Sequence, residues 1–257
     1  SDNSFDGVDS CAKLCEGCIN NGGIAIAITD HLDIDDPELD VDEFVKNQFE
    51  DTLNAKIDFK GKLAVLQGIE LGQGIYRKEQ SEELLDKYRY DYVLGAIHNL
   101  DNMKDFYYLD YTEYDVDDLL RRYFDAELEL AKWNRTDSLA HLTYPLRYII
   151  GKYKMSVDLT KYDGVINEIF ETLIRNKKAL ELNVSSLFNY HFDTMPSKEY
   201  IKRFHDMGGK YVTVGSDSHY ADKVCLGIDK GFDILKECGY EHFTIFVGHE
   251  PWLMPLR

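Results

Sequence analysis

The stretch YVTVGSDSH, residues 211–219, begins as a buried strand and then turns at Gly215. Its β-branched and aromatic residues favour an extended backbone, and the glycine and serines that follow are typical of a turn. Asp217 and His219 lie two residues apart, so in an extended segment both side chains share one face. The stretch alone is compatible with a plain turn and with a pair that binds a metal or a reacting group.

Outward from this stretch, apolar runs alternate with amphipathic stretches along the whole chain of 257 residues. Apolar runs predict buried strands at residues 24–28, 63–71, 92–97, 138–142, 179–184, 210–214 and 243–247. Amphipathic stretches predict helices at residues 10–21, 41–58, 79–89, 116–133, 162–176, 197–207 and 231–238. The pattern predicts an α/β fold of βα units without a visible domain boundary, either a closed or nearly closed barrel or an open doubly wound sheet.

Several of these predicted strands close on residues that bind metals. The strand ends carry Asp30, His31, Glu70, His98, His141, Asp217 and His219. A single histidine at a strand end is usually a hydrogen-bonded surface residue, and an acidic residue there can cap the next helix. Because the carboxyl ends of parallel strands lie at one end of the fold, the repetition predicts a shared site.

The predicted ligands are imidazoles and carboxylates without a thiolate. Such a set suits Zn, Mn or Fe at a catalytic centre, rather than a structural zinc held by thiolates. Six or more ligands exceed what one tetrahedral ion needs, so we expect two or three divalent ions close together. The remaining histidines of the described pattern, His205, His242 and His249, are interpreted as structural or exposed.

The order TDH, GIE, a strand-end histidine, a later strand-end histidine and GSDSH resembles the PHP (polymerase and histidinol phosphatase) family. The resemblance runs over essentially the whole chain. The segments LELNVSS, YVTVGSDSHYADKVCLGID and FTIFVGHEPWLMPL look like those of the monofunctional histidinol-phosphate phosphatases. The resemblance implies a distorted (β/α)7 TIM-like barrel, a single PHP domain over residues 1–257, and a trinuclear metal cluster at the strand carboxyl ends.

The resemblance also implies a ligand set. The metal ligands that it implies are Asp6, His31, Glu70, His98, His141, Asp217 and His219, with Glu70 as the bridging carboxylate. The family pattern opens with His-x-His on the first strand, followed by Ser or Thr and an acidic turn, and residues 1–7 look like the part after that pair. We expect the pair and its strand to precede Ser1, because a barrel without its first strand would carry an open seam in its core.

The activity that the resemblance implies is that of a metal-dependent phosphomonoesterase, a histidinol-phosphate phosphatase. The hypothesis is that hydroxide bridging two ions attacks phosphorus while a third ion holds a phosphoryl oxygen. Catalytic roles fall to Glu70, Asp217 and His191, with His191 or a metal-bound water protonating the leaving alcohol. Arg147 is the candidate phosphate clamp, since guanidinium offers two parallel donors, although a surface role fits as well. Asn183 is a candidate substrate-binding residue.

One departure from the family leaves the substrate open. Relatives often carry an arginine after the LELNVS-type segment, where this chain has Ser186-Leu187-Phe188-Asn189. A PHP-type phosphoesterase acting on a nucleotide or another small phosphate ester is therefore an alternative. An inactive metal-binding PHP module is a second alternative, because the His-x-His pair does not stand in the sequence.

The formal net charge of −18 restricts the partners. Such a field repels nucleic acid polymers and anionic membrane surfaces, and it repels a phosphorylated metabolite unless bound cations reverse its sign locally. We expect a small phosphorylated metabolite as the partner, no nucleic acid polymer and no membrane, and the sequence leaves the oligomeric state open. Five cysteines and no visible signal peptide favour a reducing compartment, the cytoplasm.

Three of the cysteines raise a further alternative. Cys11, Cys15 and Cys18 have the C-x3-C-x2-C spacing of some iron–sulfur sites. On a helix that starts at Asp9-Ser10, however, the three thiols fall on one face as small buried hydrophobes. The second interpretation is favoured, because glycine stands where such iron–sulfur motifs have an aromatic residue.

Overall fold

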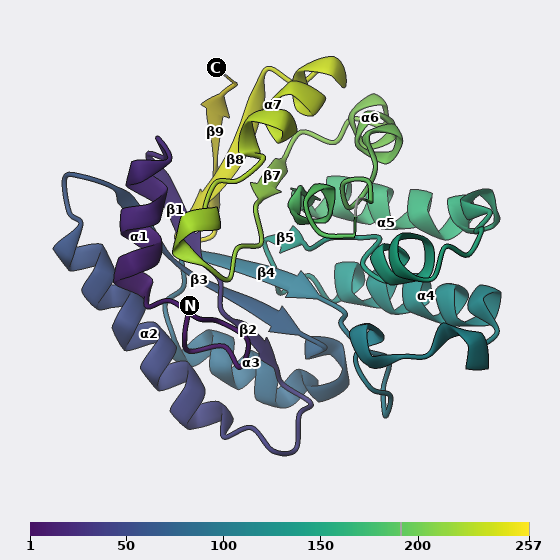
Figure 1. Ribbon diagram of the computed structural model, residues 1–257, viewed down its shortest axis with the longest axis horizontal. Helices are drawn as coiled ribbons and strands as arrows, with labels where there is room; N and C mark the ends of the chain where they lie inside the picture. The colour runs from purple at the N-terminus through teal and green to yellow at the C-terminus, as the bar shows by residue number, and fades with distance from the viewer. Residues whose placement is uncertain (191, 257) are drawn as a thin grey trace.

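Six parallel strands form a curled sheet in the order β1-β3-β4-β5-β6-β7 in the computed structural model, which describes residues 1–190 and 192–256 (Figure 1). The strands are β1 (Ala25–Ile28), β3 (Ala64–Gly72), β4 (Tyr92–Ala96), β5 (Ser138–Leu139), β6 (Ala179–Asn183) and β7 (Val212–Gly215). Successive strands along this path are separated by helices, as the predicted βα units require. The α/β prediction is therefore confirmed as a curled, half-barrel sheet.

The first strand is interrupted at Asp30. β1 pairs with residues 64–67 of β3, and a short β2 (His31–Asp33) pairs with residues 70–72 of the same strand. At the break, Ser4 Oγ donates to Asp30 Oδ1 over 3.1 Å and accepts the backbone N–H of His31 over 3.1 Å. His31 thus begins a second pairing segment instead of closing the strand, because the N-terminal segment satisfies the polar groups exposed by the break.

Helices alternate with the strands and begin at residues that cap them. The helices are α1 (Cys11–Asn20), α2 (Val41–Asp58), α3 (Lys78–Lys87), α4 (Val116–Trp133), α5 (Asp163–Asn176), α6 (Lys198–Asp206) and α7 (Ile228–Glu237). Asp40 and Asp115 accept N–H groups in the first turns of α2 and α4, which fixes the predicted starts of both helices. Shorter helical turns are η1 (Gly74–Arg77), η2 (Phe106–Tyr108), η3 (Tyr111–Glu113), η4 (Arg147–Lys152), η5 (Leu159–Tyr162), η6 (Ser185–Leu187) and η7 (Ala221–Lys223).

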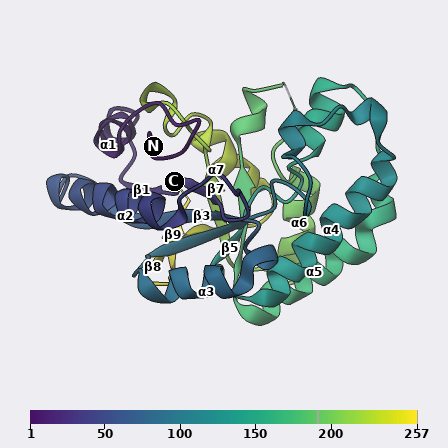
Figure 2. The same cartoon turned by 90° about the horizontal axis from the view of Figure 1, so that it is seen from below.

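The main core lies between the sheet and the helices α4, α5 and α6. Figure 2 shows α3, α4 and α5 following one another along the outer side of the sheet. Phe124, Phe170 and Phe204 are fully buried in one apolar cluster that also contains Leu180 and Val212 of the sheet. Burial of each aromatic side chain stabilises the fold by about 1.5–3 kcal/mol. This packing holds β4 to β7 in place beneath the loops at their carboxyl ends.

The last predicted strand does not join the parallel sheet. β8 (His242–Val247) instead pairs antiparallel with β9 (Glu250–Pro255). A two-residue turn at Gly248 and His249 joins the two strands. Its φ angles of 58° and 67° are both positive, as in the type I′ turn that is common in β-hairpins. The predicted strand at residues 243–247 forms, but its expected place in the parallel sheet was wrong, because it pairs with β9 across this turn.

The hairpin turn seals the amino ends of two central strands. His249 Nδ1 lies 2.8 Å from Asp137 Oδ2, just before β5. The N–H of Gly248 donates to Asp91 Oδ1 over 3.2 Å, just before β4. His249 is therefore structural, as the sequence predicted, and the carboxyl ends of the strands remain the open end.

The two ends of the strand path, β1 and β7, border a cavity of about 810 Å³. Residues of α1, β1, β7 and β8 line the cavity. The sheet described here therefore curls without pairing β1 to β7. Among the described residues, every helix is too short or too polar to cross a lipid bilayer.

Candidate metal centre

Three buried side chains converge on one point at the carboxyl ends of β3, β4 and β5. His98 Nε2 and His141 Nε2 lie 3.0 and 2.9 Å from the same oxygen, Oε1 of Glu70. The two ring nitrogens are 3.3 Å from each other. Glu70, His98 and His141, called here the inner group, thus aim two nitrogens and one oxygen at a shared position.

The charges of the inner group fit a bound cation. Burial alone would raise the pKa of Glu70, but its hydrogen bonds with His141 and His98 hold the pKa well below the usual value. Burial likewise opposes a charged His98, yet Asp33 and Glu70 raise its pKa well above the ordinary value. The site is therefore stabilised by positive charge, and two imidazoles with a carboxylate are a donor set that Zn, Mn or Fe accepts.

A second convergence lies nearer the surface. Asp6 Oδ1 is 2.9 Å from His31 Nε2, and Asp6 Oδ2 is 3.0 Å from His219 Nε2. Asp6, His31 and His219, called here the outer group, come from the N-terminal segment, β2 and the loop after β7. The hydrogen bond to Asp6 is the main cause that raises the pKa of His219 to about 9.

Asp33 connects the two groups and was not predicted from the sequence. Its Oδ1 lies 2.9 Å from His98 Nδ1, and its Oδ2 lies 3.8 Å from His31 Nδ1. A carboxylate behind an imidazole fixes which ring nitrogen carries the proton and leaves the other nitrogen free for a metal. Asp33 therefore turns His98 Nε2 toward Glu70.

The approach of Asp33 to His98 depends on Gly72. A Cβ at this position would lie 2.1 Å from Asp33 Oδ1 and 3.3 Å from His98 Nδ1. Any larger residue would push the carboxylate away from the ring, since real Cβ atoms do not approach so closely. The glycine in the sequence ELG is thus a close-approach position in the metal centre.

A third cluster surrounds Asp217. Its Oδ2 accepts from Arg147 Nη2 over 3.3 Å, from Ser185 Oγ over 3.1 Å and from Asn183 Nδ2 over 3.4 Å. Burial opposes ionisation of Asp217, but the charge of Arg147 is the main cause that keeps the pKa of this carboxyl below its usual value. Glu70 and Asp217 line the same cavity.

Arg147 is held in a fixed orientation. Its guanidinium lies over the rings of Tyr144 and Tyr148, at 5.1 and 5.9 Å from their centroids. Nη2 donates to Ser185 Oγ over 2.8 Å, whereas the buried Nε has no partner among the described residues. A buried N–H donor without a partner can bind an anion. The burial of Arg147 argues against a surface arginine, and its role as phosphate clamp stays a prediction.

The amino-acid sequence of this chain matches a known protein family. Residues 1–185 match the PHP domain. This chain belongs to the PHP domain family.

Two relatives of this PHP protein are named as histidinol-phosphatases. A histidinol-phosphatase of Lactococcus lactis subsp. lactis is 27% identical over 251 residues, which cover 95% of this chain and 91% of the relative. A probable histidinol-phosphatase of Clostridium acetobutylicum is 29% identical over 223 residues, covering 84% of this chain and 82% of the relative.

A solved structure extends the comparison to the fold. The crystal structure of histidinol phosphate phosphatase from Lactococcus lactis subsp. lactis, complexed with zinc, L-histidinol and phosphate, matches with a TM-score of 0.81. The match covers 98% of this chain and 96% of that one at 23% sequence identity. The similarity confirms the recognition of the PHP fold from the sequence.

The structure of the PHP chain gathers the predicted ligands into three clusters. The inner group takes Glu70, His98 and His141, the outer group takes Asp6, His31 and His219, and Asp217 lies with Arg147 and Asn183. Asn183 Oδ1 accepts the hydroxyl of Ser185 over 2.7 Å, so this amide positions neighbours of Asp217. The predicted proton donor His191 lies outside the described residues.

Glu181 is a second buried acid that sequence reasoning missed. It lies on β6 and accepts the backbone N–H of His141 over 2.8 Å and the amide of Asn183 over 3.3 Å. Burial is the main cause that raises its pKa to about 8. Both missed acids had a signal, because Asp33 stands two residues after His31 and Glu181 two residues before Asn183, which places each pair on one face of a strand.

Proposed function

We propose that this protein is a metal-dependent histidinol-phosphate phosphatase, which converts L-histidinol phosphate and water to L-histidinol and phosphate. The observation that carries the proposal is the inner group, whose three buried donor atoms lie within 3.3 Å of one another. The names of the relatives from Lactococcus and Clostridium support the choice of ester.

The proposed centre holds two or three divalent ions, Zn, Mn or Fe. The inner and outer groups are the proposed holders of two ions, and Asp217 with Glu70 is the proposed part of a third position. Divalent ions there would neutralise phosphate charge and lower the pKa of a water molecule. The proposed frame is the (β/α)7 TIM-like barrel of a single PHP domain.

Individual side chains of this protein have separate proposed roles in binding and catalysis. Glu70 keeps a full negative charge between two imidazoles, and Asp33 holds one of these imidazoles in a fixed tautomer. The guanidinium of Arg147, held between two tyrosines, is the proposed donor to the phosphate oxygens. His191 stays the proposed proton donor to the leaving alcohol.

The partner of this site is proposed to be a small phosphorylated metabolite, encountered in the cytoplasm. The net charge of −18 disfavours polyanions. A small ester could present its phosphate to divalent ions held by the inner and outer groups. Nucleic acid polymers and membranes are therefore not proposed as partners.

Phosphate release from a panel of esters tests the proposal. L-histidinol phosphate, nucleoside monophosphates and sugar phosphates are each mixed with the purified chain and Zn, Mn or Fe. We expect kcat/KM for L-histidinol phosphate to exceed the others at least about tenfold, as the names of the relatives from Lactococcus and Clostridium indicate. A preferred nucleotide would point to a nucleotide phosphoesterase, and bound metal without any turnover would point to an inactive module.

A second experiment addresses Arg147. Arg147→Lys keeps the charge and loses the two-pronged geometry, so we expect KM for the ester to rise about tenfold with a smaller change in kcat. Arg121→Lys is the matched control, since Arg121 lies on the exposed face of α4. An unchanged KM in Arg147→Lys would remove this residue from the phosphate site.

A further inference from the structure

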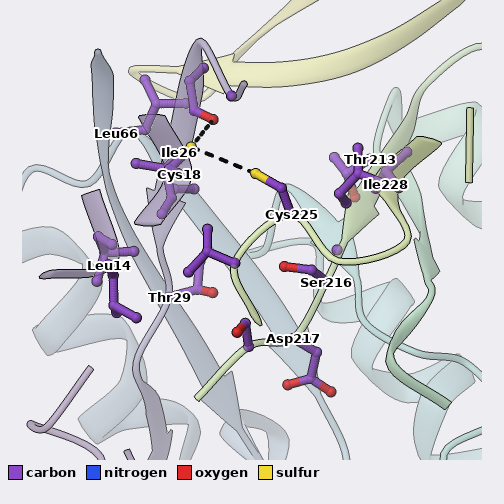
Figure 3. Close-up of a pocket in the computed structure, with 18 of the residues that line it drawn as sticks. Leu14, Cys18, Ile26, Thr29, Leu66, Thr213, Ser216, Asp217, Cys225 and Ile228 are labelled. Atoms are coloured by element: carbon purple, nitrogen blue, oxygen red, sulfur yellow. Dashed lines mark hydrogen bonds between the residues drawn. The ribbon is translucent and has the colours of Figure 1, made fainter. Parts of the chain in front are cut away.

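Two cysteines far apart in the sequence meet at one wall of the cavity. Cys18 Sγ on α1 lies 3.7 Å from Cys225 Sγ, in the segment between η7 and α7 (Figure 3). Cys18 also lies 3.6 Å from the carbonyl oxygen of Ala25, which its thiol can donate to. Cys18 is fully buried, whereas Cys225 is partly exposed.

We propose that Cys18 and Cys225 form a reversible redox-modification site, in which a peroxide converts the two thiols to a disulfide between α1 and the segment that follows His219. The proposal concerns neither the metal ligands nor the phosphatase reaction. It therefore stands or falls independently of the proposed function.

The pair has the asymmetry of a reactive thiol and a resolving thiol. Cys225 is the accessible partner, and its hydrogen bond from Cys18 lowers its pKa, which favours the thiolate. The same hydrogen bond and burial raise the pKa of Cys18, so this thiol keeps its proton until the second step. A low-pKa, accessible cysteine beside a second thiol is the usual arrangement of a peroxide-sensitive pair.

The chemistry balances with a peroxide as the two-electron oxidant. The Cys225 thiolate attacks one oxygen of hydrogen peroxide, the O–O bond breaks, and the departing oxygen takes a proton to become water. The sulfur of Cys18, losing its proton, then attacks the sulfur of the Cys225 sulfenic acid and releases a second water. Two thiols and one hydrogen peroxide thus give one disulfide and two waters.

The backbone around the pair favours the bond. The sulfur atoms must move from 3.7 Å to about 2.05 Å, a shift within the reach of two rotating side chains. Asn21 Nδ2 donates to the carbonyl of Val224 over 2.8 Å, which holds the two segments in register beside the thiols. Gly23 makes room, because a Cβ there would lie 2.3 Å from Cys18 Sγ and 3.1 Å from Cys225 Sγ.

The disulfide would fasten two segments that serve the outer group. The N–H of Val8 donates to the carbonyl of His219 over 3.2 Å, and the N–H of Ala221 donates to Asp9 Oδ2 over 2.9 Å. These hydrogen bonds already join the N-terminal segment, which carries Asp6, to the loop that carries His219. A disulfide between Cys18 and Cys225 would add a covalent link between α1 and the segment after His219. This link would restrain local separation of the two segments.

Treatment of the purified full chain with hydrogen peroxide tests the proposal. We expect the free thiols of the denatured protein to fall from the five of the reduced chain to three, and a dithiol reductant to restore them. Peptide mass spectrometry should find a Cys18–Cys225 crosslink. Five persisting thiols, or a crosslink that joins other cysteines, would overturn the proposal without any variant.

Variants separate this pair from the other thiols. Cys18→Ser and Cys225→Ser should each abolish the loss of two thiols, while Cys238→Ser, at the end of α7, should leave it unchanged. The oxidised wild type should also melt about 5 °C or more above the reduced protein, because the bond closes a long loop. A disulfide that forms equally well in Cys225→Ser would refute the assigned pair.

Discussion

The inner and outer groups use the same residue types but differ in how the chain holds them. In the inner group the side chains of Glu70, His98 and His141 are 11%, 6% and 3% exposed. In the outer group Asp6 and His219 are 40% and 33% exposed. The inner ligands follow three adjacent strands of the sheet, whereas Asp6 and His219 stand on loops.

This difference shows that burial and support go together in the metal centre. Asp33 contacts the ring of His98 from behind, and Glu181 accepts the backbone N–H of His141, so two inner ligands are each held by a neighbouring acid. In the outer group, Asp6 and His219 depend on hydrogen bonds between the N-terminal segment and the loop after β7. A prearranged site binds a cation without first ordering its ligands, so we infer tighter binding and a larger catalytic share for the inner group.

The largest expected effect concerns turnover. Glu70→Gln keeps the shape of the side chain and removes the charge that both imidazoles face, so we expect kcat to fall about a thousandfold or more. Asp6→Asn should reduce kcat by only about ten- to a hundredfold. Phosphate release measures both, with circular dichroism to check folding. Equal losses in the two variants would break the distinction between the groups.

Cation affinity provides the next test. Removal of zinc with chelators of graded strength should reveal two classes of site that differ at least about tenfold in affinity. Glu70→Gln should remove the tight class, and Asp6→Asn should remove only the weak class. Metal content measured by mass spectrometry gives the stoichiometry. A single class of site, or loss of the tight class in Asp6→Asn, would contradict the assignment.

The support of His98 is the third test. Asp33→Asn should weaken the tight cation site about ten- to a hundredfold, because the amide no longer fixes the tautomer of His98. Gly72→Ala should act in the same direction, since its Cβ would occupy the space of Asp33 Oδ1. Gly164→Ala on α5 is the control, as nothing lies within 4 Å of a Cβ added there. Competition with a zinc-binding dye measures the affinity, and ¹⁵N NMR reports the tautomer of His98.

The last test leaves the metal centre and concerns stability, at Glu127 on α4. This fully buried carboxyl lies beside the hydroxyl of Tyr123, and burial is the main cause that raises its pKa to about 8. The folded protein therefore binds a proton that the unfolded chain releases near pH 4.5, so stability is present at low pH and is lost as the pH rises through 8.

Substitution isolates this contribution. Glu127→Gln removes the titration, so we expect the decline in the free energy of unfolding between pH 5 and pH 8 to become shallower by roughly 1 kcal/mol per pH unit. Urea unfolding at several pH values measures it. Glu129→Gln, on the exposed face of the same helix, should leave the slope unchanged. Parallel slopes for Glu127→Gln and the wild type would mean that Glu127 is ionised in the folded state.

The sequence predicted well those parts of the structure that depend on local patterns. The helices at residues 41–58 and 116–133 begin and end as predicted, because apolar spacing and an N-cap aspartate act within a few residues. The positions of His98 and His141 at strand ends were predicted because each histidine directly follows an apolar run in the sequence. Their convergence within 3.3 Å followed from the geometry of parallel strands.

What could not be predicted depends on contacts between distant segments. The run at residues 243–247 reads as any buried strand, and only the turn after it and its contacts with Asp91 and Asp137 decide its place. Asp33 stands after the run that ends in Asp30 and His31, and its contact with His98 Nδ1 at 2.9 Å joins residues 65 positions apart. The partnership of Cys18 and Cys225 joins residues 207 positions apart, which no spacing rule connects.

The seam between β1 and β7 has a consequence for the handling of this protein. Edge strands ordinarily offer unpaired backbone groups to other molecules and so promote aggregation. Here both edges border an internal cavity whose wall includes Leu14 and Cys18 of α1. Because α1 packs beside β1, aggregation by pairing at that edge should be slowed by any change that keeps α1 docked.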